Sequence, residues 1–428
     1  MKRTVEAGKT LLIDGPASAT LLSGTAEILG AQIQVGSRIV IREGKRFPFE
    51  VKKKAEFDLL IGEKAGANEV PASTIPKSWE DAANTILEQK SQPVIVMIVG
   101  GIDSGKTTFS AYLANKALKE KRNVTIVDAD LGQSDVGPPS TIGSCRITKP
   151  IKDPFEARGE NICFIGVTSP SSAVPKVIEG IAKVKEKVLK RGVNLLIVNT
   201  DGWIEGEDAI RYKVALTKQV NPNIVVAIQE KNELTFLLGA LIETQNLAIE
   251  SSPAVRKRDR EERRLLRELG YKKYLKGATL KSFPLGWIRV FGVPFGTGAK
   301  PSREHMSKIT EHLGTTPIYC EETLDSIFMV LSKEQWADEE IARGLEATLK
   351  KKAKIVWEGD EEGLLVALHN KDENFLGIGI LEQIDYERRV LKIHTNVKND
   401  VSSIHIGQIK LDRTGKELGQ TDVFADYI

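Results

Sequence analysis

The chain has 428 residues, 41% of them hydrophobic and 28% charged, and its formal net charge is +3. A chain of this length is too long to fold around one hydrophobic core, so two or three domains are expected. The nearly neutral charge excludes a uniformly basic surface, so nucleic-acid binding would need local clusters of lysine and arginine. Three widely spaced cysteines without a C-x-x-C pair indicate neither a disulfide framework nor a zinc site.

The sequence predicts a cytoplasmic protein without membrane contact. Its first residues lack the apolar core of a signal peptide. No uncharged run approaches the ~18 residues that a membrane-spanning helix needs.

Residues 1–70 are expected to form a small all-β, sandwich-like domain, because short apolar runs alternate with turns such as Asp14-Gly15-Pro16. Residues 71–92 follow as a linker and a helix, with Ser78 as the expected N-cap. Apolar residues recur at helical spacing in this helix and predict a buried face. That face comprises Trp79, Ala82, Ala83, Ile86 and Leu87.

Residues 93–280 alternate strand-like and helix-like segments, which is typical of an α/β domain with a parallel sheet. Among the helix-like segments the pattern is clearest over residues 174–189, where apolar residues share one face. Five apolar runs with little alternation predict strands that are buried on both faces. These runs are Val94–Val99, Val124–Val127, Ile162–Val167, Leu195–Val198 and Ile224–Ile228.

The first of these strands leads into the pattern G-x-x-x-x-G-K-T, and a helix-compatible stretch follows. This strand–loop–helix context indicates a phosphate-binding loop, because glycines turn backbone N–H groups toward an anion at a helix N-terminus. Lys106 is expected to reach the β/γ-phosphates and Thr107 to ligate Mg²⁺. The predicted nucleotide-binding residues are Gly100, Gly101, Ile102, Asp103, Ser104, Gly105, Lys106, Thr107 and Thr108.

Two aspartates, Asp128 and Asp130, follow the second strand. Ligands of open α/β sheets bind at the carboxyl ends of the strands. One carboxylate can therefore face the metal while the other faces an entering nucleophile. The alternative is a pair of solvated turn aspartates.

Two further features allow two interpretations each. Trp203 follows the fourth strand and is either core, which the local pattern favours, or a stacking platform for a base.

Residues 256–276 contain ten Lys or Arg against four Asp or Glu. Arginines recur there at three- and four-residue steps, which fits either a solvated helix face or a lid over a phosphate site.

Together these motifs resemble the polynucleotide 5′-hydroxyl kinases, a family that includes the RNA kinase of the tRNA-splicing and pre-mRNA cleavage machineries and the nucleolar rRNA-processing kinase. The match comprises the phosphate-binding loop and the D-x-D-x-G-Q sequence from Asp128 to Gln133. It also includes the T-x-G-W "clasp" from Thr200 to Trp203 and the arginine-rich lid segment, residues 251–276. The layout is closest to an archaeal single-chain version.

The resemblance implies transfer of the γ-phosphate of ATP or GTP to the 5′-hydroxyl end of RNA, with DNA as a further acceptor and Mg²⁺ as cofactor. It implies that Asp130 activates the 5′-hydroxyl and that Asp128 serves the metal. Nucleic acid would contact Gln133, Thr200, Gly202 and Trp203. The transferred phosphate would contact lid arginines, for which Arg256, Arg260, Arg263 and Arg264 are the candidates.

Residues 281–428 are expected to form a β-rich domain, with a barrel among the arrangements that the pattern allows. One helix, at about residues 334–351, interrupts the strand-like runs. Five histidines are scattered without metal-ligand spacing and are interpreted as structural. The sequence indicates no function for this region and no protein partner.

Two other functions are alternatives to a kinase. A nucleotide-binding scaffold in an RNA-processing complex would need the phosphate-binding loop, but neither Asp130 nor a working lid. A dimeric partitioning or metal-insertion ATPase usually carries a second lysine just after the first glycine of the loop. That position is Gly101, which counts against the ATPase.

Overall fold

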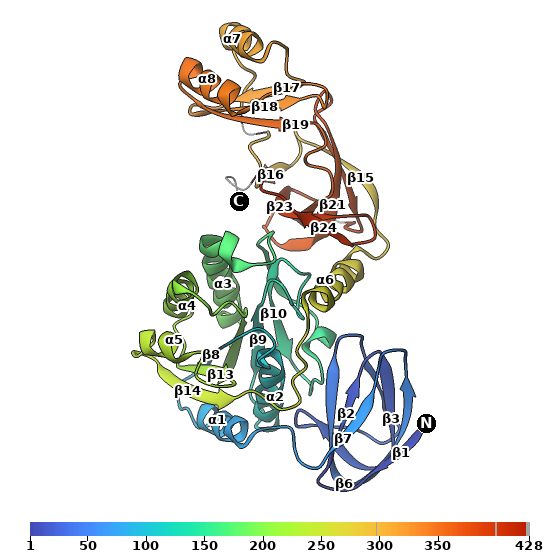
Figure 1. Ribbon diagram of the computed structural model, residues 1–428. Coiled ribbons are helices and arrows are strands. Elements are labelled where there is room, and N and C mark those ends of the chain that lie inside the picture. The colour runs from blue at the N-terminus through green and yellow to red at the C-terminus, as the bar shows by residue number, and fades with distance from the viewer. Residues whose placement is uncertain (297, 399, 425–428) are drawn as a thin grey trace. The chain divides into compact units, whose positions relative to one another are not determined.

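The computed structural model describes residues 1–296, 298–398 and 400–424. The chain separates into two compact units, residues 1–270 and 271–428. The first unit contains two sheets, and the second contains two more (Figure 1). No helix among the described residues is long and apolar enough to cross a membrane.

The N-terminal part of the first unit is all-β, as predicted (Figure 1, blue). Side chains along its longest strand alternate between core and solvent, so that Ala55, Phe57 and Leu59 are buried while Asp58 and Leu60 are exposed. The strands are β1 (Lys2–Val5), β2 (Thr10–Asp14), β3 (Ala17–Ile28), β4 (Ala31–Gln32), β5 (Arg38–Ile41), β6 (Arg46–Ile61) and β7 (Ala67–Val70), and all pair antiparallel.

Helix α1 (Lys77–Leu87) buries the five residues that the sequence predicts. The predicted N-cap is wrong, because Pro76 occupies that position with an extended backbone and the helix begins two residues earlier than expected, at Lys77. The Ser78 hydroxyl instead donates to the Glu250 carboxylate and accepts from the Glu250 N–H, both at 3.2 Å. Ser78 thus joins α1 to the edge strand of the central sheet.

The central sheet confirms the α/β class but contains two strands that the sequence analysis missed. Its order is β11-β10-β9-β12-β8-β13-β14, and β10 runs antiparallel to both neighbours within an otherwise parallel sheet. Polar residues interrupt the apolar pattern of β10, and β14 is a half-exposed edge strand. The strands are β8 (Val94–Gly100), β9 (Val124–Ala129), β10 (Thr141–Ile147), β11 (Asn161–Phe164), β12 (Leu195–Thr200), β13 (Ile224–Gln229) and β14 (Gln245–Glu250).

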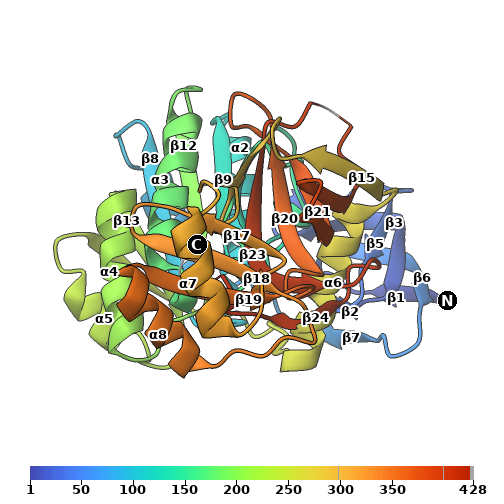
Figure 2. The same ribbon diagram turned by 90° about the horizontal axis from the view of Figure 1, so that it is seen from above.

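Alternate residues of β8 enter two different cores. Val94, Val96 and Ile98 face the core that contains α1, α2 and the N-terminal sheet. Ile95, Met97 and Val99 face the opposite core, where α3, α4 and α5 pack on one side of the sheet (Figures 1 and 2). The helices are α2 (Lys106–Lys119), α3 (Val174–Leu189), α4 (Glu207–Val220), α5 (Thr235–Ala240) and α6 (Arg260–Leu275).

The second unit is β-rich, as predicted, but its described residues form two helices rather than one. Helix α7 (Arg303–Leu313) was not predicted. Its buried residues are Ile309 and Leu313, and this short apolar pattern is too weak to indicate a helix. Helix α8 (Glu339–Leu349) matches the expected helix. One sheet comprises β15 (Thr279–Pro284), β16 (Arg289–Phe291), β20 (Leu364–His369), β21 (Phe375–Asp385), β22 (Val390–Thr395), β23 (Ser403–Leu411) and β24 (Glu417–Gln420). The other comprises β17 (Tyr319–Glu322), β18 (Ser326–Leu331) and β19 (Lys352–Trp357).

Candidate active site

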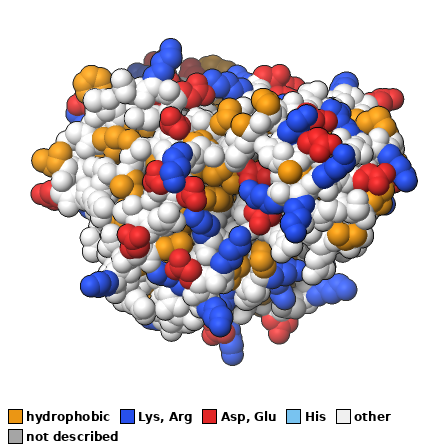
Figure 3. Space-filling model, turned by 90° about the horizontal axis from the view of Figure 1, so that it is seen from below, with side chains coloured by type: hydrophobic (Ala, Val, Ile, Leu, Met, Phe, Trp, Pro, Cys, Tyr) orange, Lys and Arg blue, Asp and Glu red, His pale blue; other side chains and the backbone are white. Residues whose placement is uncertain are grey.

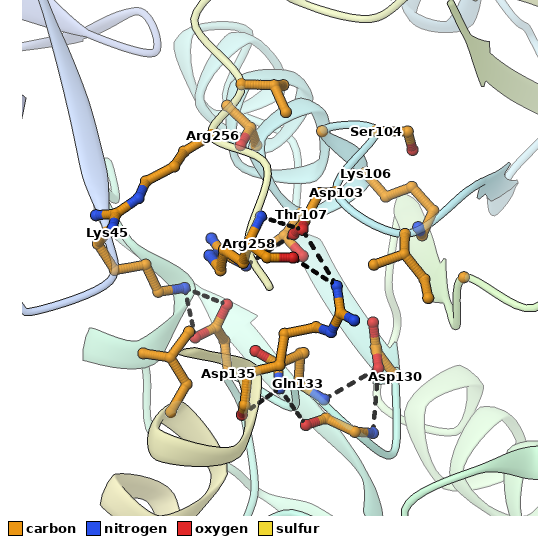
Figure 4. A pocket seen from close by; sticks show the side chains of 18 of the residues that line it. Lys45, Asp103, Ser104, Lys106, Thr107, Asp130, Gln133, Asp135, Arg256 and Arg258 are labelled. Atoms are coloured by element: carbon orange, nitrogen blue, oxygen red, sulfur yellow. Dashed lines mark hydrogen bonds and ion pairs between the residues drawn. The ribbon is translucent and has the colours of Figure 1, made fainter. Parts of the chain in front are cut away.

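A cavity of about 880 Å³ lies in the first unit. Its lining comes from the phosphate-binding loop, the turn after β9, the clasp, part of residues 252–270 and side chains of the N-terminal sheet. Figure 4 shows Asp103, Lys106 and Thr107 of the loop, Asp130 after β9 and Arg258 of the lid segment around the same space. Lysine and arginine side chains also gather around a hollow on the face shown in Figure 3, with carboxylates among them.

The predicted phosphate-binding loop joins β8 to α2. Gly105 is the N-cap of α2 at φ 99°, a left-handed conformation that favours glycine. The first N–H groups of a helix have no partner within it, so those of α2 are available to an anion. Residues 101–108 line the cavity, whereas Gly100 lies behind it. A Cβ atom on Gly100 would come within 2.6 Å of the Ile228 carbonyl oxygen.

Lys106 is buried at the start of α2. Its Nζ donates to the carbonyl oxygens of Gly100 at 3.0 Å and Gly101 at 2.6 Å. Burial lowers the pKa of Lys106 to about 8, and the nearby Asp130 carboxylate opposes this shift. The ammonium group therefore already lies within the loop, next to the position for a phosphate.

The two aspartates after β9 have different surroundings. Asp130 lines the cavity, and its Oδ1 accepts from the N–H groups of Gly132 at 3.1 Å and Gln133 at 3.0 Å. No hydrogen-bond donor among the described residues reaches its Oδ2. Burial raises the pKa of Asp130, while Lys106 opposes the shift. Its carboxylate is thus oriented by one oxygen and open at the other.

Asp128 lies behind the cavity with 2% of its surface exposed. It accepts from the N–H groups of Asp135 at 2.7 Å and Asp130 at 3.3 Å, and from Asn199 Nδ2 at 3.0 Å. Burial raises the pKa of Asp128 to about 7, and the neighbouring Asp130 charge adds to the shift.

Asn199, at the end of β12, is a site residue that the sequence analysis missed. Its Nδ2 donates to both Thr107 Oγ1, at 3.2 Å, and Asp128 Oδ1, so it connects the phosphate-binding loop to β9. Its Oδ1 is buried without a hydrogen-bond partner among the described residues. The residue stands directly opposite Asp128 in the sheet register, which no local sequence pattern indicates.

The clasp lies directly against the phosphate-binding loop. A Cβ atom on Gly202 would come within 2.8 Å of the Ile102 nitrogen, so only glycine fits this approach. Trp203 is half-buried, stacks on Tyr212 with ring centroids 5.6 Å apart, and also lines the cavity. The tryptophan is therefore partly packed and partly open to the cavity, and its stacking on a base stays a prediction. Thr200 is fully buried and donates to the Ile98 carbonyl at 2.8 Å.

The lid segment brings only some of the predicted arginines to the cavity. Arg256 and Arg263 line it, whereas Arg260 and Arg264 do not. Helix α6 begins at Arg260, so the helical spacing that grouped Arg256 with the others does not apply. Arg256 instead pairs with Glu262, and Arg264 pairs with Glu261 and Glu268.

Arg258, which was not predicted, ties the lid segment to the loop. Its NH1 donates to Asp103 Oδ1 at 3.1 Å, its N–H donates to Asp103 Oδ2 at 2.9 Å, and its Nε donates to the Gly44 carbonyl at 3.1 Å. Arg263 NH1 lies 3.7 Å from the same carboxylate. Gln133 Nε2 donates to the Arg263 carbonyl at 3.0 Å, so Gln133 supports the lid from the β9 side.

The N-terminal sheet also contributes cations, to which the sequence analysis gave no role. Lys45 Nζ donates to both oxygens of Asp135 at 2.9 Å (Figure 4). Arg42 pairs with Asp153 at 2.5 Å and lies over the Phe155 ring. Both cations line the cavity, so its charge combines side chains from distant parts of the sequence.

Comparison with known proteins finds one matching family model and several relatives of this chain. The family model described as the mRNA cleavage and polyadenylation factor CLP1 P-loop matches residues 100–277. A polyribonucleotide 5′-hydroxyl-kinase of Pyrococcus furiosus is 28% identical over 353 residues, which cover 81% of this chain and 96% of the relative. The corresponding kinase of Methanocaldococcus jannaschii is 27% identical, with 81% and 95% covered. The chain is thus similar to the Clp1 proteins over residues 100–277 and to archaeal polyribonucleotide 5′-hydroxyl-kinases over most of its length.

The family resemblance drawn from the motifs is thereby confirmed. A solved Clp1p–Pcf11p complex contains a chain with the same fold, with a TM-score of 0.65 at 14% identity and coverage of 96% of this chain and 97% of that one. The fold class predicted from the sequence agrees with that neighbour.

Proposed function

We propose that this chain is an enzyme that transfers the γ-phosphoryl group of a nucleoside triphosphate to the 5′-hydroxyl end of RNA. The observation that carries the proposal is that Lys106 of the phosphate-binding loop and the open oxygen of Asp130 face one cavity. A nucleotide-binding scaffold would need the loop without an oriented carboxylate beside it. ATP and GTP are both proposed donors, and DNA is proposed as a second acceptor.

The reaction follows from the positions of these groups. The 5′-oxygen of the acceptor attacks the γ-phosphorus and forms a new P–O bond. The bond from the γ-phosphorus to the β–γ bridging oxygen breaks, and the nucleoside diphosphate leaves with that electron pair. Asp130 Oδ2 takes the proton of the hydroxyl as the attack proceeds, a role that its raised pKa favours.

Cations around the cavity would offset the negative charge of the transferred group. We assign Lys106 to the β/γ-phosphates and Arg258 and Arg263 to the transferred phosphoryl group. Asp103 holds both arginines at the mouth of the loop, so they are oriented before substrate binds. Arg256 lines the same cavity and is a third candidate.

The residues at the loop fit a magnesium ion. Thr107 Oγ1 lines the cavity, and the buried Asn199 Oδ1 beside it lacks a partner among the described residues. We propose that Thr107 holds the ion and that Asp128 supports it from behind through Asn199. When bound, the ion neutralises charge on the β- and γ-phosphates. No group of three His, Cys, Asp or Glu side chains among the described residues could hold a metal, so the triphosphate would supply further ligands.

Several broader assignments complete the proposal. We propose an N-terminal β domain over residues 1–70, a linker and helix over residues 71–92, a kinase domain over residues 93–280 that includes the lid, and a C-terminal domain over residues 281–428. We also propose a cytoplasmic location and a role in RNA processing or repair.

Replacing single lid arginines by alanine tests the assignment of the phosphate contacts. Arg258→Ala and Arg263→Ala should each lower turnover by ~10²-fold or more, because an arginine on the transferred phosphate contributes a large part of the rate. Arg260→Ala and Arg264→Ala lie outside the cavity and are matched controls that should stay within about twofold, as surface changes do. Equal effects in all four variants would mean that the lid acts through its overall charge.

Trp203→Ala tests the stacking platform. Base stacking is worth ~1–3 kcal/mol, so affinity for 5′-hydroxyl oligonucleotides should fall roughly 5- to 150-fold whatever the base sequence. Affinity for ATP, which the loop determines, should barely change. Trp203→Phe keeps a ring and is the control. A parallel loss of ATP affinity would instead mean that the truncation distorts the loop through Gly202.

The substrate classes are separated by one assay with labelled γ-phosphate. Transfer is measured from ATP and from GTP to RNA and DNA oligonucleotides of the same sequence, with 5′-phosphorylated oligonucleotides as the blocked control. The proposal predicts transfer to 5′-hydroxyl RNA that stops when a chelator removes Mg²⁺. Transfer to blocked ends as well would contradict the acceptor assignment.

A further inference from the structure

A buried ion pair joins Lys213 of α4 to Asp201 of the clasp and has no role in the mechanism above. We infer that Lys213 is a positioning residue that holds Trp203 at the cavity and so sets the affinity for the acceptor strand. The inference rests on the proposed function, because it specifies how that reaction's acceptor is bound.

Lys213 is fully buried, which is rare for a lysine unless its charge is paired. Its Nζ donates to Asp201 Oδ2 at 2.8 Å, to the Asp201 carbonyl at 3.0 Å and to Thr200 Oγ1 at 3.2 Å. All three acceptors belong to the first half of the T-x-G-W clasp. The ammonium group therefore binds consecutive residues of one loop and fixes the path of its backbone.

Asp201 carries this constraint to the tryptophan. Its Oδ1 accepts from the Trp203 N–H at 2.9 Å, and its Oδ2 accepts from the Tyr212 hydroxyl at 2.7 Å as well as from Lys213. Tyr212 precedes Lys213 on α4, and its ring stacks on Trp203 at an interplanar angle of 22°. The indole is thus held by its backbone through Asp201 and by its ring through Tyr212.

A purely packing role does not account for this arrangement. Burying a charged pair costs desolvation energy, and apolar residues of similar volume are often as stabilising or more so. Every hydrogen bond of the Lys213 ammonium ends on the clasp, and the clasp in turn contacts both the loop, through Gly202 and Ile102, and the cavity, through Trp203. The Lys213–Asp201 pair therefore holds the clasp in one defined conformation, which keeps the Trp203 ring at the cavity.

The test is a double-mutant cycle with separate readouts for acceptor and nucleotide. Lys213→Met leaves Asp201 unpaired, so Lys213→Met/Asp201→Asn is made as well, in case the single variant does not fold. Both should raise the KM for a 5′-hydroxyl oligonucleotide by roughly 5-fold or more, up to the effect of losing the stacked ring itself. The KM for ATP should stay within about twofold. Lys218→Met, an exposed lysine on the same helix, is the control.

In a Trp203→Ala background the Lys213 change should add little to the acceptor KM, because residues that act through one another are non-additive. A Lys213 effect of equal size in both backgrounds would overturn the inference, as would equal rises in the KM for the oligonucleotide and the KM for ATP.

A third readout needs no turnover. Acrylamide quenching of Trp203, taken as the difference from the matching Trp203→Phe protein, should increase in the Lys213 variants. Unchanged quenching would overturn the inference even if the chain proved not to be a kinase.

Discussion

Asp130→Asn is expected to lower turnover by ~10²-fold or more, the usual loss when a positioned general base is removed. Asparagine has nearly the same shape, and its Oδ1 can still accept from the Gly132 and Gln133 N–H groups that orient Asp130. It lacks the second carboxylate oxygen that would take the proton. Nucleotide affinity should remain, because the phosphate-binding loop is untouched. Single-turnover rates and nucleotide titrations on the same preparation measure both quantities.

Asp128→Asn is the informative companion. Asp128 does not line the cavity and reaches Thr107 only through Asn199, so its loss should raise the Mg²⁺ concentration needed for half-maximal rate. If Asp130→Asn weakened nucleotide binding and rate equally, Asp130 would be a metal or structural residue. The same Mg²⁺ shift in both variants would argue for one shared role of the two aspartates.

Lys106→Ala should remove measurable phosphoryl transfer and weaken nucleotide binding. The ammonium group lies against the Gly100 and Gly101 carbonyls, so its loss takes the positive charge from the centre of the loop. Turnover, nucleotide affinity and melting temperature should be measured together. Lys119→Ala, an exposed lysine at the end of the same helix, should leave all three unchanged. Near-normal turnover in a folded Lys106→Ala protein would refute the phosphate-loop assignment.

The parts of this site that sequence predicts are those set by local chemistry. The phosphate-binding loop depends on glycines and a lysine at fixed spacing between a strand and a helix, so one segment contains the whole signal. Asp130 could be located for a related reason, since a strand end next to such a loop indicates where side chains meet. The buried face of α1 likewise follows from helical periodicity.

Residues whose roles depend on distant contacts were not predictable in this way. Asn199 matters because the sheet register puts it opposite Asp128, 71 residues away. Arg258 looks like the neighbouring arginines in the sequence, and its hydrogen bonds to Asp103 depend on the path of the chain before α6. Lys213 has the local sequence of an ordinary helix lysine, and only the tertiary packing buries it. The same limit explains β10, where the polar residues Thr141 and Ser144 are buried because the strand pairs with β9 on one side and β11 on the other.

The most direct test of the kinase assignment is to locate the label after one round of reaction. The purified chain is mixed with γ-labelled ATP and 5′-hydroxyl RNA, the RNA is digested to mononucleotides, and the Lys106→Ala protein is treated in parallel to exclude a contaminating kinase. A phosphoryl-transfer enzyme predicts label on the 5′-terminal nucleotide, in amounts equal to the diphosphate formed, and none with Lys106→Ala. Bound but unconsumed ATP, or release of free phosphate without labelled RNA, would contradict the assignment and favour a nucleotide-binding scaffold.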